Sequence, residues 1–386
     1  MYLEASPRPF QSAVEDPAIT SPSVRLYLRL LQRCLIREIF PDQRYQAPDL
    51  VHKLSYSPEL RENGLDWPTE AETMVGRKRL NNLRECCISA IQRSVPGDFV
   101  ETGTWRGGCG ILMRALLEAF GDRERKVWLF DSFEGLPKPD PESFPVDKGD
   151  QFWTCNSYLG VSLEQVRANF QRYELLDERV RMVKGWFRDT VPNADIGPIS
   201  VLRLDGDMYE STWLVLKHFY PKLSPGGFII IDDYGAVPSC KAAVDDFRQQ
   251  HSIVASMTPV DWTGVFWQKR ESEPLQDSSA DTSCDVLQLH AKYDASQAQY
   301  AAAMHELGAV LAERDGLQSR ISGLQSRLDE LQSRLEQAAK EFQHEIASWK
   351  ERLDAERAIR EAIEHSKSWR LTEPLRRIMA ALRASR

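Results

Sequence analysis

Short apolar runs alternate with amphipathic stretches through the middle of the chain. The runs have the length and the β-branched character of strands, and the stretches repeat apolar residues three and four positions apart, as helices do. The predicted strands are Phe99–Glu101, Val127–Phe130, Val180–Val183, Val201–Leu204, Phe228–Ile231 and Asp261–Trp267, and the predicted helices between them are Ile111–Phe120, Ser162–Tyr173 and Cys240–His251. This alternation predicts at least six βα-type units with one core, an α/β fold with a doubly wound sheet.

Helical periodicity also precedes the predicted sheet. Val24–Phe40 repeats apolar residues on one face until Pro41, and Thr69–Arg93 repeats them in the same way. Residues 1–22 are rich in Pro, Ser and Ala without periodicity, which predicts a loose arm. We therefore expect one globular domain over residues 23–270.

Four aspartates directly follow two of the predicted strands. Asp205 and Asp207 come after the fourth strand, and Asp232 and Asp233 come after the fifth. A right-handed crossover brings both strand ends to one edge of the sheet, where neighbouring strands lie about 5 Å apart. Carboxylates so close repel one another unless a proton or a cation such as Mg²⁺ intervenes. From this pattern alone, the acids fit a metal site as well as they fit caps of helices or turns.

The first predicted strand leads into a glycine-rich turn, Thr102–Gly110, and then into a helix. Glycines in such a turn let the backbone pass close to a ligand at the helix N-terminus. The spacing G-x-x-x-G-G-x-G lacks the pyrophosphate-binding pattern, so the turn alone is weak evidence for a cofactor and disfavours an NAD-dependent oxidoreductase. Asp131, at the end of the second strand, either binds a ribose or caps a helix. Residues 134–160 are rich in proline and aromatic residues and predict a loop that walls a substrate site.

Composition narrows the classes of function. The net charge of −8 disfavours non-specific nucleic-acid binding, and we expect no nucleic-acid partner. The seven cysteines contain no C-x-x-C pair and the histidines are scattered, which favours reduced thiols and a metal held by carboxylates. The sequence shows no signal-peptide pattern and no apolar run of about 18 residues, so we expect a cytoplasmic protein without a membrane span.

A series of motifs covers more than half of the chain. They are Y-L-R-L-L-Q-R-C-L (27–35), T-M-V-G-R-K-R-L (73–80), G-D-F-V-E-T-G-T-W-R-G-G (97–108), D-S-F-E-G-L-P (131–137), K-G-W-F-R-D-T-V-P (184–192), L-D-G-D-M-Y-E-S-T (204–212) and I-D-D-Y-G (231–235). In content and order they resemble the macrocin O-methyltransferase family, whose members use S-adenosylmethionine and Mg²⁺ to methylate sugar hydroxyls on antibiotics and glycans. No charged position of these motifs departs from the family pattern.

The resemblance implies a Rossmann-like class I methyltransferase sheet with an N-terminal helical lid. It implies that Asp205, Asp232 and Asp233 are the metal ligands and that Asp207 is the general base. The implied cofactor site combines the first strand end and its turn, the ribose-binding acid, the residues near the adenine and the lid, namely Glu101, Thr102, Gly103, Thr104, Gly107, Asp131, Ser132, Gly185, Trp186, Thr73, Met74 and Arg79.

The chemistry of methyl transfer agrees with these roles. A neutral sugar hydroxyl is a poor nucleophile near pH 7, and a bound cation lowers its pKa and orients it. A nearby carboxylate then takes the proton. Three acids for a metal and one further acid for the proton are the set that this reaction requires.

The composition changes beyond a polar linker, residues 271–284. Residues 285–366 are rich in Ala, Glu, Gln, Arg and Leu, and three heptads repeat L-Q-S-R from Leu317, Leu324 and Leu331. With these leucines at d, the a positions hold Ile321, Leu328 and Leu335, which predicts a coiled coil and a homo-oligomer. A parallel dimer is favoured, with a trimer or a single solvated helix as the alternatives.

Residues 367–386 carry six basic residues and one acid, Glu373. Pro374 can begin a helix that places Leu375, Ile378, Met379 and Leu382 on one side. The segment fits a peripheral anchor on anionic lipid at the inner face of the membrane, or a docking helix for a protein such as a glycosyltransferase. S-K-S-W-R-L-T-E-P-L-R (366–376) also resembles a tail found on bacterial polysaccharide glycosyltransferases and methyltransferases.

Two functions from different classes remain. The first is an active O-methyltransferase that acts on a sugar or glycan acceptor in bacterial surface polysaccharide or glycolipid synthesis. The second is a methyltransferase-like scaffold, tethered to a glycan assembly complex by its coiled coil. The four clustered carboxylates favour the enzyme, because a scaffold has no need of them.

Overall fold

The computed structural model describes residues 21–46, 50–271 and 286–384. The chain forms two compact units, Met1–Tyr300 and Ala301–Arg386. Residues 1–20 of the predicted arm and 272–284 of the predicted linker lie outside the described residues, so the predicted domain boundaries stay predictions.

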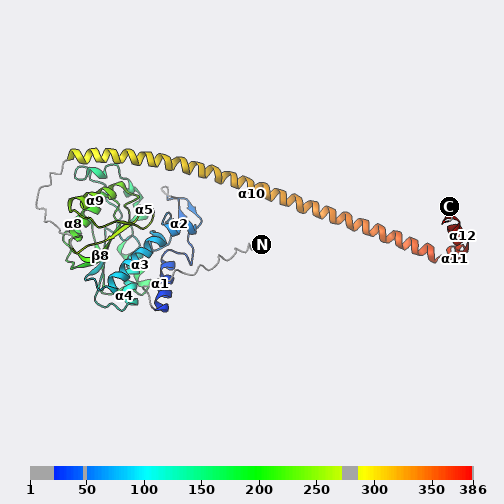
Figure 1. The fold of residues 1–386 in the computed structure, drawn as a ribbon, viewed down its shortest axis with the longest axis horizontal. Coiled ribbons are helices and arrows are strands. Elements are labelled where there is room, and N and C mark those ends of the chain that lie inside the picture. The colour runs from blue at the N-terminus through cyan, green and yellow to red at the C-terminus, as the bar shows by residue number, and fades with distance from the viewer. Residues whose placement is uncertain (1–20, 47–49, 272–285, 385–386) are drawn as a thin grey trace. The chain divides into compact units, whose positions relative to one another are not determined.

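A seven-stranded sheet forms the centre of the first unit (Figure 1). Its strands lie in the order β6 (Val180–Lys184), β5 (Val127–Asp131), β4 (Asp98–Thr102), β7 (Ile199–Leu204), β8 (Leu223–Ile231), β10 (Val265–Gln268) and β9 (Thr258–Pro259). The strands from β6 to β8 are parallel. The chain winds outward from β4 in one direction and then from β7 in the other, which confirms the predicted doubly wound sheet and puts the topological switch between these two strands.

Both faces of the sheet are covered by helices, which explains why its strands are apolar throughout. Along β8, Phe228 and Ile230 pack into one core and Ile229 and Ile231 into the other. The first core contains residues of α1 (Pro22–Leu35), α3 (Gly76–Gln92), α4 (Gly108–Ala119) and α6 (Leu163–Arg172), and the second contains residues of α8 (Tyr209–Phe219) and α9 (Pro238–Gln250).

Shorter elements complete this unit. They are a small sheet of β1 (Arg44–Tyr45), β2 (Lys53–Leu54) and β3 (Trp67–Pro68), the helices α2 (Pro58–Asn63), α5 (Asn156–Leu159) and α7 (Phe187–Thr190), and the 3₁₀ turns η1 (Pro145–Asp147) and η2 (Phe152–Cys155). The predicted loop 134–160 therefore contains three short helical turns.

Two predicted helices are longer than those in the structure. The prediction of Val24–Phe40 is wrong in its last turn, because the backbone turns left-handed at Arg37 (φ 52°) and the helix ends at Leu35. The prediction of Thr69–Arg93 is wrong in its first turns, since the residues before Gly76 do not form a helix. By contrast, the predicted helix from Ser162 is confirmed to within one residue, with the Ser162 hydroxyl accepting the N–H of Gln165.

The last predicted strand, Asp261–Trp267, differs from the observed β10 in its direction and in its first residue. β10 pairs antiparallel with β8, so it does not complete a βα unit as predicted. It begins at Val265 because the Asp261 carboxylate accepts the N–H groups of Thr263 (3.0 Å) and Gly264 (2.8 Å) and folds the preceding residues into a turn.

The C-terminal unit is helical. It contains most of α10 (Val286–His365), followed by α11 (Lys367–Leu371) and α12 (Glu373–Ala384). Ser366 separates α10 from α11 and accepts the N–H of Trp369 at 3.2 Å. The predicted a and d side chains from Ile321 to Leu335 are 56–73% exposed on the single helix, and the predicted oligomer stays a prediction. None of the described helices is long and apolar enough to cross a membrane.

Candidate active site

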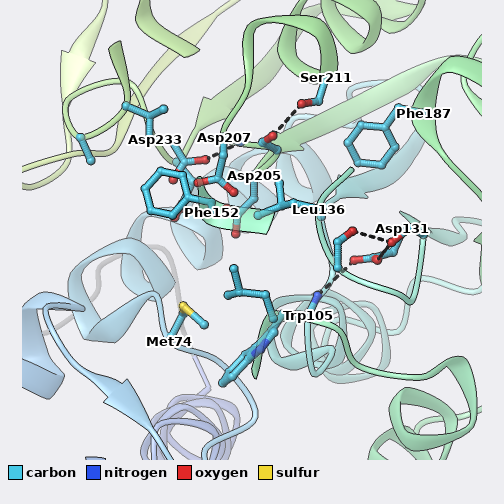
Figure 2. A pocket seen from close by; sticks show the side chains of 18 of the residues that line it. Met74, Trp105, Asp131, Leu136, Phe152, Phe187, Asp205, Asp207, Ser211 and Asp233 are labelled. Carbon is cyan, nitrogen blue, oxygen red and sulfur yellow. Dashed lines mark hydrogen bonds between the residues drawn. The ribbon is translucent and has the colours of Figure 1, made fainter. Parts of the chain in front are cut away.

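A pocket lies at the carboxyl edge of the sheet, beside the switch between β4 and β7. Figure 2 shows Asp205, Asp207 and Asp233 gathered on one side of it, with Asp131 and Trp105 on another. Residues at or just after the ends of β4, β5, β7 and β8 line it, and these are Gly103, Asp131, Ser132, Asp205, Gly206, Asp207, Asp232 and Asp233. Open α/β sheets bind ligands at this edge, so the pocket is the candidate active site.

Three carboxylates converge in the pocket. Asp205, Asp232 and Asp233 each offer an oxygen atom, and these atoms lie within 4.8 Å of one another. They meet because β7 and β8 are parallel neighbours, with Leu204 opposite Ile231. The predicted convergence of the acids at one edge is confirmed by this geometry.

Two buried arginines neutralise part of this cluster. Arg203 lies 2.7 Å from one oxygen of Asp232 and 2.9 Å from Asp205, and Arg79 pairs with the other oxygen of Asp232. Burial alone would raise the pKa of Asp232, but the two guanidinium groups outweigh it and hold the pKa below its usual range. Asp232 is therefore compensated by two guanidinium groups, and Asp205 is paired with one of them.

Asp207 and Asp233 are not compensated in this way. Burial raises the pKa of Asp207 well above its usual range, and neighbouring carboxylates, Asp205 first, add to the effect. Burial likewise raises the pKa of Asp233, to which Asp207 and Asp205 contribute. Carboxyl groups whose ionised forms are this unfavourable take up protons or bind a cation, and converging oxygen ligands fit a hard divalent cation such as Mg²⁺.

Asp207 has an unusual backbone. Its φ of 58° lies in the left-handed region, and its N–H donates to Asp233 at 3.3 Å. Trp105 and Phe133, which follow β4 and β5, have left-handed φ values of 47° and 56°. Such conformations cost energy in non-glycine residues and cluster at functional sites, which supports a role for these three strand ends.

The glycine-rich turn approaches β7 closely. At Gly103 (φ +84°), an added Cβ would lie 1.6 Å from the Asp205 carbonyl oxygen, so only glycine fits. Gly107 (φ +88°) precedes the first turn of α4. The turn thus brings bare backbone to the pocket beside the acid cluster.

Asp131 holds the shape of this turn. Its carboxylate accepts the N–H groups of Thr104 (2.6 Å), Trp105 (3.3 Å) and Phe133 (2.7 Å). Burial raises its pKa, and these hydrogen bonds oppose the rise. Asp131 lines the pocket, and ribose binding stays a prediction; the amides that it accepts belong to turns and not to the start of a helix.

The predicted cofactor residues divide into two groups. Met74, Arg79, Gly103, Asp131, Ser132 and Trp186 line the pocket, whereas Thr73, Glu101, Thr102, Thr104, Gly107 and Gly185 are not among its lining residues. Glu101 is buried beneath it and accepts from Arg203 at 2.8 Å, and burial raises its pKa to about 8. Its interactions in the structure position Arg203, and through it the acid cluster.

Several lining residues were not predicted. Trp105 and Arg188 lie within family motifs but had no assigned role, Trp262 was predicted only as part of the last strand, and no motif or periodicity marked Asp66, Trp67 and Leu214 as site residues. The predicted substrate wall contributes Leu136, Pro137, Phe152 and Leu159. Trp262 reaches the pocket rim through a turn and donates its ring N–H to the Asn63 carbonyl (2.9 Å), a contact between segments remote in sequence.

The part of the chain that contains this site is similar to known proteins. The model of the family described as Macrocin-O-methyltransferase (TylF) matches residues 25–269. The chain is 45% identical to demethyldecarbamoylnovobiocin O-methyltransferase of Streptomyces niveus, over 66% of this chain and 98% of that protein. It is 48% identical to 8-demethyl-8-(2,3-dimethoxy-alpha-L-rhamnosyl)-tetracenomycin-C 4'-O-methyltransferase of Streptomyces olivaceus, over 64% of this chain and 94% of that protein. The solved structure of the O-methyltransferase NovP superposes with a TM-score of 0.61 at 45% identity, covering 64% of this chain and 99% of NovP.

Proposed function

Because the chain belongs to the macrocin-O-methyltransferase family and is an O-methyltransferase, we propose that it transfers a methyl group from S-adenosylmethionine to a sugar hydroxyl with the help of Mg²⁺. The observation that carries the proposal is the convergence of Asp205, Asp232 and Asp233 within 4.8 Å beside a glycine-rich turn. The name of the Streptomyces olivaceus relative, a 4'-O-methyltransferase of a rhamnosyl-tetracenomycin, supports a sugar acceptor.

The three converging aspartates would hold the metal ion. When bound there, Mg²⁺ supplies positive charge that stabilises a developing alkoxide on the acceptor. Asp207 lines the same pocket and would receive the acceptor proton in its ionised form, which the positive charge of a bound metal ion would favour over the protonated form that burial stabilises. Arg203 holds Asp205 and Asp232 in place, and Glu101 holds Arg203.

The cofactor would be held on the side of the pocket formed by the glycine-rich turn. Gly103 would permit close approach of its methionine end, Asp131 would bind the ribose, and Ser132 and Trp186 would lie near the adenine. Met74, from the lid, would add an apolar wall over the cofactor. The aromatic side of the pocket at Phe152 would be the wall of the acceptor site.

The setting is bacterial surface polysaccharide or glycolipid synthesis. The family match ends at residue 269, and the C-terminal helices lie beyond it. A long helix with a basic end suits an enzyme that works beside an assembly or a surface rather than on a freely diffusing product.

Calorimetry and a methyl-transfer assay test the proposal. We expect S-adenosylmethionine to bind the full chain, and transfer to a sugar acceptor to stop in excess chelator and return with Mg²⁺. Asp232→Asn should weaken Mg²⁺ binding while leaving the fold intact. Full transfer in chelator would exclude the metal, and failure of the cofactor to bind would favour the scaffold.

A further inference from the structure

The last helix, α12, presents an apolar stripe. Leu375, Ile378, Met379 and Leu382 recur at three- and four-residue steps and are 65%, 59%, 56% and 61% exposed. At 3.6 residues per turn they span an arc of about 100° on one side of the helix. A stripe of this width is what a short helix buries when it lies on an apolar surface.

Basic residues border this stripe. Arg376 and Arg383, seven positions apart, follow one edge of it, whereas Arg377 lies on the far side and pairs with Glu373 at 2.9 Å. The last 21 residues hold six basic side chains and one acidic one, a net charge of +5 in a chain whose total is −8. Positive charge is therefore concentrated where the apolar stripe is.

α11 adds an aromatic residue to the same end. Arg376 stacks on Trp369, with its guanidinium carbon 3.3 Å from the ring centroid, and donates to the Trp369 carbonyl at 2.5 Å. Trp369 is 37% exposed and Leu371 is 80% exposed. Tryptophan and arginine side by side are typical of groups that sit at the level of lipid headgroups, with one end apolar and the other polar.

We propose that α11 and α12 form a docking element for an anionic lipid surface. The apolar stripe enters the boundary between headgroups and acyl chains, and Arg376 and Arg383 at its edge contact lipid phosphates. Charge complementarity favours an anionic lipid surface as the partner. The element is basic within an acidic chain, and an anionic bilayer offers negative charge along the whole length of the stripe. The twelve residues of α12 are too few to span a bilayer, so the helix lies on it.

Vesicle binding by the full chain tests this. We expect co-sedimentation with vesicles of phosphatidylcholine and phosphatidylglycerol, at least about tenfold weaker binding to phosphatidylcholine alone, and loss of binding as salt rises. Equal binding to both vesicles, or none to either, overturns the proposal. The second result would indicate that the stripe docks on a protein.

Two matched pairs of substitutions distinguish the effect of the apolar stripe on vesicle binding from the effect of net charge. Leu375→Glu with Ile378→Glu places two acids on the stripe, and Ala380→Glu with Ala384→Glu places two acids on the opposite side, so both pairs change the net charge equally. We expect the first pair to abolish vesicle binding and the second to weaken it only a few-fold, with equal helix content by circular dichroism. Equal losses in the two pairs would mean that charge alone attracts the chain, and would overturn insertion of the stripe.

Discussion

Arg79, near the start of α3, forms a buried ion pair with Asp232 at the end of β8. The same guanidinium lies 3.1 Å from Asp261, in the turn before β10. The helical segment that precedes the sheet is thereby fixed to the acid cluster and to the last strand. One side chain links three parts of the chain that are remote in sequence.

Removal of this arginine should destabilise the protein. Arg79→Ala removes the guanidinium partner of the buried Asp261 and one of the two guanidinium partners of the buried Asp232, and we expect a loss of about 3–5 kcal/mol in the free energy of unfolding. If Asp232 also binds the metal, Mg²⁺ should restore part of the loss and stabilise the variant more than the wild type. Urea unfolding with and without Mg²⁺ measures both effects. Arg123→Ala, which removes an exposed pair with Glu118, is the control and should change stability by at most about 1 kcal/mol.

Asp207→Asn should separate the base from the metal ligands. We expect turnover to fall by about 10²–10⁴, because a positioned base contributes this much, with Mg²⁺ and S-adenosylmethionine affinity retained. Steady-state kinetics and calorimetry give the two readouts. Loss of metal binding in the variant would instead make Asp207 a ligand.

Gly103→Ala should disable the cofactor site. The new Cβ would collide with the Asp205 carbonyl at a backbone φ of +84°, so the turn and β7 must move apart. We expect S-adenosylmethionine binding by calorimetry to fall by at least tenfold. Gly197→Ala is the control, since its Cβ would meet no atom within 4 Å, and normal cofactor binding by Gly103→Ala would contradict the assigned turn.

Asp147 should make stability depend on pH. Its carboxylate accepts the N–H groups of Tyr209 (2.7 Å) and Glu210 (3.0 Å) at the start of α8, and burial raises its pKa to about 6. The pKa of Asp147 is higher in the folded state than in the unfolded state, so the folded state holds the proton more tightly. The free energy of unfolding should therefore fall as pH rises from about 4 to 6, by at most about 1.4 kcal/mol per pH unit.

The variant Asp147→Asn checks the assignment. It has no proton to lose there, so the fall in unfolding free energy between pH 4 and pH 7 should be smaller than in the wild type. Urea unfolding at both pH values measures the difference. An unchanged pH profile would show that Asp147 has the same pKa in the folded and unfolded states.

The exposed a and d side chains of α10 should pair with another copy of the chain. Leu324 and Leu331 are 63% and 59% exposed on the single helix, and their heptad spacing is that of a helix seam. Leu324→Lys with Leu331→Lys should dissociate the oligomer in light scattering, whereas Ser326→Lys with Ser333→Lys, on the opposite side, should not. A monomeric wild type at micromolar concentration would show that α10 does not self-associate.

The sequence by itself determined the parallel strands and the acids at their tips. An apolar run that must be buried on both faces is a local property, and a crossover helix forces neighbouring parallel strands to end at one edge. Hence Asp205 and Asp232 could be placed together before any coordinates. The sequence motifs identified the family in the same way, because they lie on these strand ends.

Only the tertiary structure decided which groups neutralise the acids. Arg203 projects from within β7, and nothing in its local pattern indicates that it contacts Glu101 and Asp232 at once. The reversed direction of β10, the arrival of Trp262 at the pocket and the use of Asp131 by the turn amides depend likewise on pairings across long sequence separations. Those contacts form only when the whole sheet and its covering helices are in place. The periodicity of apolar residues reports burial within one element and therefore carries no information about them.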